Sequence, residues 1–251
     1  IWNALRATEQ VWLPAFEQGS LVVEQASALE ALADAATTPV VATILVRKIN
    51  EQPADQQPRT VELIASQGDP QSLAELTRWI LTSKRSPDDR GRLLQTVMTL
   101  SKSRNLVPAE AAQWLPELLQ HVDMTADNAS MLAATLAQAA EQWKVGAASP
   151  TLNRWLDQAL ATSDLGLMSA VLNSMASLGT GSDRQRISQL ASAGEQSLAA
   201  RSAAIAAQSS YDLNAASRNI IGLYGQLRSV QDPSVLTPAV QAVLGRKPGA
   251  A

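Results

Sequence analysis

Apolar residues recur at every third or fourth position through most of this sequence, which is the spacing of one face of an α-helix. The clearest stripes are Leu115, Leu118, Leu119 and Val122, then Leu132, Leu136, Ala139 and Trp143, and then Met168, Val171, Leu172 and Met175. The alternation of apolar with polar residues that a half-buried β-strand needs is missing. The pattern therefore predicts an all-α protein.

Helix boundaries are marked by short polar residues that stand directly before proline. Asp or Ser before a helix can accept a hydrogen bond from the first free amides, and proline at the first helical position loses no hydrogen bond. This combination occurs at Asp69-Pro70, Ser86-Pro87, Ser149-Pro150 and Asp232-Pro233. Further helix starts are expected at Ser163-Asp164 and in residues 125–128, while Gly179 and Gly181 predict a helix end and a turn.

The predicted helices follow one another with short connections, so successive helices should be antiparallel neighbours. Pairing them gives units of about 35 to 42 residues, the length of helical-hairpin repeats. The units cover residues 69–104, 107–144 and 149–179, with less regular pairs at 39–67, 183–209 and 211–244. We therefore expect residues 1–251 to form a single domain, a right-handed α-solenoid of about five to seven stacked antiparallel hairpins.

A short motif built on Trp-Leu-Pro returns along the chain. Residues 113–119 read Gln-Trp-Leu-Pro-Glu-Leu-Leu, residues 11–16 read Val-Trp-Leu-Pro-Ala-Phe, and residues 154–160 keep the frame without the proline. Proline inside a helix removes one backbone hydrogen bond and bends the helix. We place Pro14 and Pro238 in the same helical setting as the proline of residues 113–119.

A Leu-Pro-x-Leu-Leu segment before an Asp-containing turn resembles the first helix of the HEAT-repeat family. The resemblance covers most of the chain and implies a HEAT-like solenoid; because HEAT motifs are degenerate, it indicates fold better than role. The second helices depart from the family pattern. Asp89-Arg90 fits the usual pairing of Asp with a basic residue, whereas Asp127-Asn128 and Asp164-Leu165 lack the arginine.

Residues 232–251, which begin Asp-Pro-Ser-Val-Leu-Thr-Pro, are similar to a stretch of large exported planctomycete-type dehydrogenase-like proteins. In that family a β-propeller, a HEAT-like helical region and a c-type cytochrome domain share one polypeptide. The resemblance implies that this chain is the helical region and a fragment or processed part of a longer protein. The sequence lacks the Cys-x-x-Cys-His haem motif, so any haem would lie outside these residues.

Composition and charge narrow the function classes. The chain carries 20 Lys and Arg against 23 Asp and Glu, a net charge of −3, whereas proteins that bind nucleic acid carry a basic excess. No apolar run reaches the roughly 18 residues of a membrane span, so we expect no membrane insertion. Cysteine is absent, which removes thiol nucleophiles and thiolate metal sites. Together with the resemblance to exported proteins, this absence favours an exported or periplasmic protein.

Residue types that carry catalysis are sparse. His121 is the only histidine, and with Asp123 it would supply too few ligands to close a metal site. Asp88 and Asp89 belong to the first turn of a predicted helix, where negative charge is favourable. Residues 179–181 read Gly-Thr-Gly, but no strand precedes them and no Lys-Ser or Lys-Thr pair follows, so they form no phosphate loop. We assign no catalytic, cofactor-binding or metal-binding residue.

One basic cluster is formed by Lys84, Arg85, Arg90, Arg92, Lys102 and Arg104. Such a stripe could receive an acidic partner or, with Trp79 nearby, the DNA of a HEAT-like DNA-processing protein. The acidic residues inside the cluster and the net charge of the chain favour a solvated helix face instead.

The tryptophans at equivalent motif positions, Trp12, Trp114 and Trp155, are expected to pack in the core between units. Trp2 and Trp143 lie outside this register and could be surface anchors, but burial in the core or under a cap is the default expectation.

The sequence thus favours a non-catalytic module for protein–protein interaction or scaffolding. Its second helices would present a shallow concave surface to a protein partner or to neighbouring domains of a larger polypeptide. One alternative is the structural helical region of a large exported redox protein with dehydrogenase and cytochrome c parts. The other alternative, from a different class, is a HEAT-like DNA-processing protein.

Overall fold

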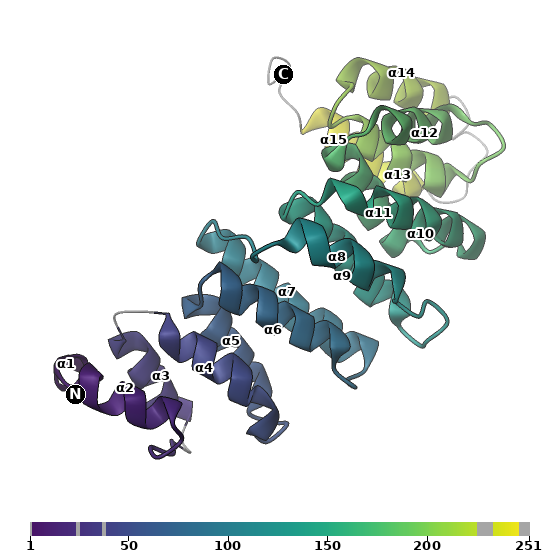
Figure 1. The fold of residues 1–251 in the computed structure, drawn as a ribbon. Helices are drawn as coiled ribbons and strands as arrows, with labels where there is room; N and C mark the ends of the chain where they lie inside the picture. The colour runs from purple at the N-terminus through teal and green to yellow at the C-terminus, as the bar shows by residue number, and fades with distance from the viewer. Residues whose placement is uncertain (1, 24–25, 37–38, 225–232, 246–251) are drawn as a thin grey trace. The chain divides into compact units, whose positions relative to one another are not determined.

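A computed structural model describes residues 2–23, 26–36, 39–224 and 233–245 (Figure 1). Within these ranges the chain forms fifteen α-helices and short 3₁₀ turns, with no β-strand. The prediction of an all-α protein is confirmed. The chain divides into two compact units, residues 1–111 (unit 1) and residues 112–251 (unit 2).

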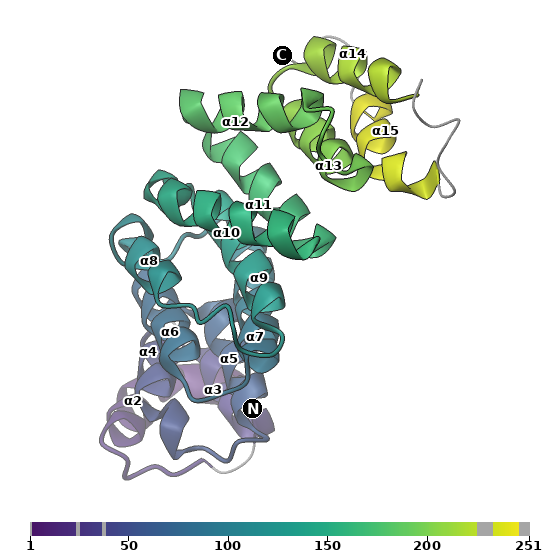
Figure 2. The same cartoon turned by 90° about the vertical axis from the view of Figure 1, so that its right-hand side faces the viewer.

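Unit 1 is built from two layers of helices. Its helices are α1 (Trp2–Ala7), α2 (Glu9–Glu17), α3 (Ala26–Ala35), α4 (Val40–Lys48), α5 (Gln57–Gln67), α6 (Pro70–Thr82) and α7 (Pro87–Ser103). From α3 onward each helix packs on the next one in the chain, and α5 also packs between α3 and α7 (Figures 1 and 2). Since α4 packs on α6 as well, the odd-numbered helices form one layer and α4 and α6 the other.

Unit 2 also contains a row of odd-numbered helices. Its helices are α8 (Ala111–Gln120), α9 (Ala129–Gln142), α10 (Ser149–Thr162), α11 (Leu165–Leu178), α12 (Gly181–Ser192), α13 (Leu198–Gln208), α14 (Leu213–Tyr224) and α15 (Thr237–Leu244). The odd-numbered helices α9, α11, α13 and α15 pack one on the next in a row. α10 packs on α11, and α12 packs on α13 (Figure 2). α11 therefore lies between α9 and α13, and α13 lies between α11 and α15.

Three of the predicted helix starts are confirmed by side-chain caps. Asp69 accepts a hydrogen bond from the amide of Ser72 at 2.8 Å, and Ser86 accepts one from the amide of Asp89 at 3.1 Å. Asp164 caps α11 in the same way. Gly179 ends α11 in the left-handed conformation, with φ of 58°, as the sequence predicts. The starts of α6, α7 and α11 are thus determined by residues close by in the sequence.

The other predicted caps differ in the structure. Ser149 is the first residue of α10 rather than its cap, and its hydroxyl donates to the carboxylate of Asp183 instead. Asn128 precedes α9 in a left-handed conformation, and its side chain makes no capping bond. Asp232 lies outside the described residues, while Pro233 begins a 3₁₀ turn that leads into α15.

The tryptophans of the recurring motif are buried: Trp12, Trp114 and Trp155 are 8%, 7% and 1% exposed. Trp143 is also buried and packs against Trp114, with ring centroids 6.3 Å apart, so the end of α9 contacts α8. The expectation for Trp2 is wrong, because this side chain is 45% exposed. Its indole N–H donates to the carbonyl of Asp34.

The prolines of the motif divide into two groups. Pro14 and Pro116 lie inside α2 and α8, as the motif predicts. Pro238 instead lies in the first turn of α15. A proline in the first turn replaces an amide that has no helical partner, so it removes no hydrogen bond and bends nothing. The placement of Pro238 inside a bent helix is therefore wrong.

Candidate interaction surface

Unit 2 carries a hollow of about 570 Å³ on its row of odd-numbered helices. We name it the α11 hollow after the helix that supplies its floor. Its lining residues are Gln138 and Glu141 of α9, Ala170, Asn173, Ala176 and Ser177 of α11, and Arg184, Ser210 and Tyr211 at one side. The α11 residues lie three or four positions apart, on one helix face. Because the side chains of these α11 residues are short, a hollow remains between α9 on one side and Arg184, Ser210 and Tyr211 on the other.

One wall of the α11 hollow is held by a tyrosine. The hydroxyl of Tyr211 donates to the carbonyl of Arg184 at 2.9 Å, and the guanidinium of Arg184 lies 5.2 Å from the centre of the Tyr211 ring. Burial raises the pKa of Tyr211 above its ordinary value, so the phenol is neutral at neutral pH. This wall is therefore a fixed aromatic ring beside a cation.

The α11 hollow is lined by two amide side chains, one on α9 and one on α11, that make no hydrogen bond within the described fold. The amides of Gln138 and Asn173 make no hydrogen bond to any of the residues that the structure describes, and both side chains are exposed. Nearby, Lys144 donates to the hydroxyl of Ser177 at 3.2 Å. Since each amide side chain offers a donor and an acceptor, the floor can pair with both groups of a peptide bond.

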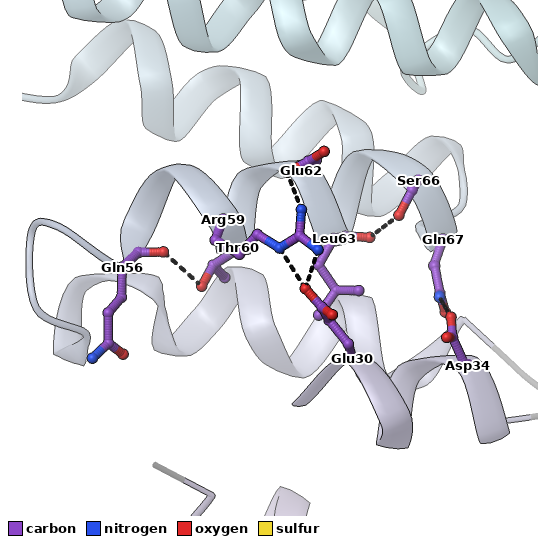
Figure 3. A network of polar contacts seen from close by, with 9 residues as sticks. All are labelled: Glu30, Asp34, Gln56, Arg59, Thr60, Glu62, Leu63, Ser66 and Gln67. Carbon is purple, nitrogen blue, oxygen red and sulfur yellow. Dashed lines mark hydrogen bonds and ion pairs between the residues drawn. The ribbon is translucent and has the colours of Figure 1, made fainter. Parts of the chain in front are cut away.

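The corresponding layer of unit 1 has a different surface. Arg59 on α5 pairs with Glu30 on α3 and with Glu62 on its own helix (Figure 3). Gln67 on α5 donates to the carboxylate of Asp34 on α3. These side chains surround a small hollow of about 210 Å³. Most of their polar groups are paired with one another. Hydrogen bonds from Arg59 to Glu62 and Glu30 raise the pKa of Arg59 further above its ordinary value, so the cation is permanent.

Three arginines of the basic cluster predicted from the sequence bond to other groups of the chain itself. Arg90 donates to the carbonyl of Leu81 at 3.1 Å, and Arg92 pairs with Asp89 at 2.5 Å. Arg104 donates to the carbonyl of Gly68 at 2.6 Å, where α5 has ended. These arginines join turns and helix ends instead of forming one continuous basic stripe.

The remaining sequence candidates lie apart from the α11 hollow. His121 is exposed in the turn after α8. The Asp123 carboxylate accepts from the hydroxyl and the amide of Thr125, which lowers the pKa of Asp123. The Ser86 hydroxyl and then Arg92 lower the pKa of Asp89. Among the described residues no group of at least three His, Asp and Glu side chains is placed to hold a metal ion.

Sequence reasoning missed a buried polar network of unit 2, centred on Asp183. The side chain of Asp183 is 2% exposed and accepts hydrogen bonds from Ser149, Asn153 and Thr180. Asp183 looks like an ordinary acidic residue in the first turn of α12. Its partners on α10 are 30 and 34 residues away, so only the repeat length could have suggested the contact.

Comparison with models of known protein families, with curated proteins and with solved structures found no match for this chain. In the part of the chain that the structure describes, no helix combines the length and the apolar character needed to cross a membrane.

Proposed function

We propose that this chain is a non-catalytic protein-interaction module of the HEAT-like helical-repeat type. In this proposal the α11 hollow binds a segment of a protein partner or of a neighbouring domain of the same polypeptide. The observation that carries it is the α11 hollow itself, which lies on adjacent second helices of the proposed hairpins and exposes the amides of Gln138 and Asn173.

The repeat assignment is supported by how far apart in sequence the contacting residues lie. Trp2 bonds to Asp34, 32 residues away, and Lys144 bonds to Ser177, 33 residues away. Ser174 bonds to the carbonyl of Ala137, 37 residues away. In a helical-repeat protein each unit contacts its neighbours, so cross-helix contacts recur at about one repeat length. The separation of 37 residues lies within the expected unit of roughly 35 to 42 residues, and those of 32 and 33 residues lie slightly below it.

The lining of the α11 hollow suits a peptide segment better than a small apolar ligand. Pockets for small molecules are lined mainly by hydrophobic and aromatic groups. Here the floor is made of small residues and amides, with Glu141 and Arg184 supplying opposite charges at the edges. An extended chain could lie along α11 with its backbone paired to Asn173 and Gln138.

The proposal is tested by blocking the floor of the hollow. Asn173→Arg places a long charged side chain at an exposed position, so the fold should be kept while the hollow is filled. Gln113→Arg, at an exposed site on α8, is the matched control on a first helix. Proteins retained from native extract by the parent chain would be identified and purified, and their affinity for both variants would be measured by calorimetry.

We expect Asn173→Arg to weaken the partner by at least about tenfold, a loss of about 1.4 kcal/mol, and Gln113→Arg to change the affinity by less than about twofold. A partner that binds both variants like the parent chain would exclude the α11 hollow as the binding site. Circular dichroism of both variants controls for loss of helix.

A further inference from the structure

A second hollow of about 570 Å³ lies in unit 1, at the end of α6 and beside the start of α5. We name it the Trp79 hollow. Its charged lining residues are Lys84 and Arg85, and no carboxylate lines it. The chain as a whole is acidic, with a net charge of −3. A hollow whose charged lining residues are all cations therefore differs in charge from the chain as a whole.

The aromatic and cationic groups of this hollow are held in place by residues 28 and 29 positions earlier in the chain. The indole N–H of Trp79 donates to the side-chain oxygen of Asn50 at 2.7 Å. The guanidinium of Arg85 lies over the Trp79 ring, 5.8 Å from its centre, and donates to the side-chain oxygen of Gln57. The ring and the guanidinium are thus oriented before any ligand arrives, which reduces the entropy cost of binding.

These contacts leave binding capacity unused. A guanidinium has five N–H donors, and only the bond to Gln57 is made by Arg85 among the described hydrogen bonds. Lys84 is exposed and makes no described hydrogen bond or ion pair. The hydroxyls of Thr82 and Ser83 already donate to carbonyls of α6. Arg85 also attracts the neighbouring carboxylate of Asp89, so Lys84 and the remaining donors of Arg85 are the groups of this hollow that are available to a ligand.

We propose that the Trp79 hollow binds a glutamate or aspartate side chain of an acidic peptide segment. The planar fork of Arg85 suits the two oxygens of a carboxylate, and Lys84 adds a second positive charge. The aliphatic part of the bound side chain would lie against the Trp79 ring. The site lies in unit 1 and is separate from the α11 hollow, so it adds a ligand class that the proposed function does not specify.

Nucleic acid fits this surface poorly. A duplex is bound by many cations that neutralise successive phosphates. Near the hollow, however, Arg92 pairs with Asp89 and Arg90 donates to the carbonyl of Leu81. Arg104 lies at the other end of α7, where it donates to the carbonyl of Gly68. The geometry therefore offers one compact site for a single acidic group and no extended basic track.

The test uses the full chain and a fluorescein-labelled peptide of alternating glutamate and serine, with binding followed by fluorescence anisotropy at low salt. In two matched peptides the glutamates are replaced by glutamine or by phosphoserine. A labelled DNA duplex is the fourth probe. The protein variants are Arg85→Gln, Arg85→Lys and Lys84→Gln. Arg92→Gln removes the same charge from the same segment, outside the hollow, and serves as the control.

We expect the glutamate peptide to bind and the glutamine peptide not to bind. Arg85→Gln should weaken binding at least about tenfold, as expected for the loss of charge-assisted hydrogen bonds. Lys84→Gln and Arg85→Lys should weaken it less, and Arg92→Gln by less than about twofold, because an exposed ion pair contributes little.

Three results would overturn the assignment. The first is equal weakening by Arg92→Gln, which would indicate diffuse charge attraction. The second is tighter binding of the phosphoserine peptide or of DNA, and the third is unchanged binding by Arg85→Gln and Lys84→Gln. Thermal melts show whether Arg85→Gln stays folded. If Arg85→Gln unfolds, the test rests on Lys84→Gln, because Lys84 is exposed and its replacement should not disturb the fold. Asn173→Arg lies in unit 2, so failure here leaves the test of the α11 hollow unaffected.

Discussion

At the scale of single residues, the most consequential group is a carboxylate that the chain keeps charged and almost completely buried. Asp183 accepts hydrogen bonds from Asn153 at 2.8 Å and from Ser149 at 2.8 and 2.9 Å. Burial alone would raise the pKa of Asp183, but the hydrogen bonds from Thr180, Asn153 and Ser149 together lower it below its ordinary value. The buried charge is tolerated because its oxygens are paired.

We therefore expect Asp183 to make stability depend on pH. Because its pKa is lower in the folded state than in the unfolded chain, the charged carboxylate stabilises the fold above about pH 4, and this contribution is lost as the pH falls through the lowered folded-state pKa. Asp183→Asn should reduce the free energy of unfolding by about 1 to 3 kcal/mol at neutral pH. The deficit should shrink below about pH 4, as followed by urea denaturation at several pH values.

The control for this prediction is Asp157→Asn. Asp157 is another carboxylate that contacts α12, through an ion pair with Arg186, but its side chain is 69% exposed, and such pairs contribute little to stability. An equal loss of stability in both variants, or a deficit for Asp183→Asn that does not change with pH, would contradict the role given to the buried carboxylate.

At the scale of elements, the helix ends show how far local sequence determines structure. Asp69, Ser86 and Asp164 cap their helices as predicted, because each cap needs only residues three positions away. Ser149 has the same local sequence but is drawn to Asp183 from a distant helix. α1 was not predicted, because its six residues are too few to show the apolar spacing of an amphipathic helix. Capping chemistry is thus predictable until a tertiary contact competes for the capping side chain.

The candidate site was predictable only in part, for the same reason. The placement of a binding surface on the second helices follows from the repeat pattern and stays a prediction. The individual residues were not identified, because Asn173 and Tyr211 have no distinctive neighbours in sequence. They are brought to one hollow by the packing of α11 beside the turn after α13.

The turn between α11 and α12 allows a matched test of backbone conformation. Gly179 has φ of 58°, and a Cβ there would lie 2.7 Å from a guanidinium nitrogen of Arg184. Gly179→Ala should therefore destabilise the chain by about 1 to 2 kcal/mol. A Cβ at Gly181, the first residue of α12, meets nothing within 4 Å, so Gly181→Ala should be neutral or slightly stabilising. Melting temperatures of the two variants compare these outcomes, and a larger loss for Gly181→Ala would contradict the assigned turn.

At the scale of the whole molecule, helices pack mainly on the next helix and the next but one. Leu172 on α11 is completely buried, and α11 packs on α9, α10, α12 and α13. Stability in such an arrangement is a sum over neighbouring contacts, so damage should remain local.

We expect Leu172→Ala to cost about 2 to 5 kcal/mol, because it leaves a cavity. Amide hydrogen exchange in unit 2 should then accelerate most in α9, α10, α11 and α13, and less in α15, which packs on α13 and α14. Mass spectrometry of peptides from each helix gives this comparison. A uniform increase across unit 2 would indicate one cooperative core and would weaken the repeat interpretation.

The Asp183 contact also has a consequence for insertions and deletions. Ser149 and Asn153 reach the same carboxylate because they lie one turn apart on α10. One residue inserted between them would rotate one of the two away by about 100°, and the carboxylate would lose a partner. Loss or gain of a complete helical pair leaves this spacing intact. The buried carboxylate therefore constrains the spacing of its partners on α10. The chain can gain or lose whole hairpins without disturbing this contact, but not single residues within α10.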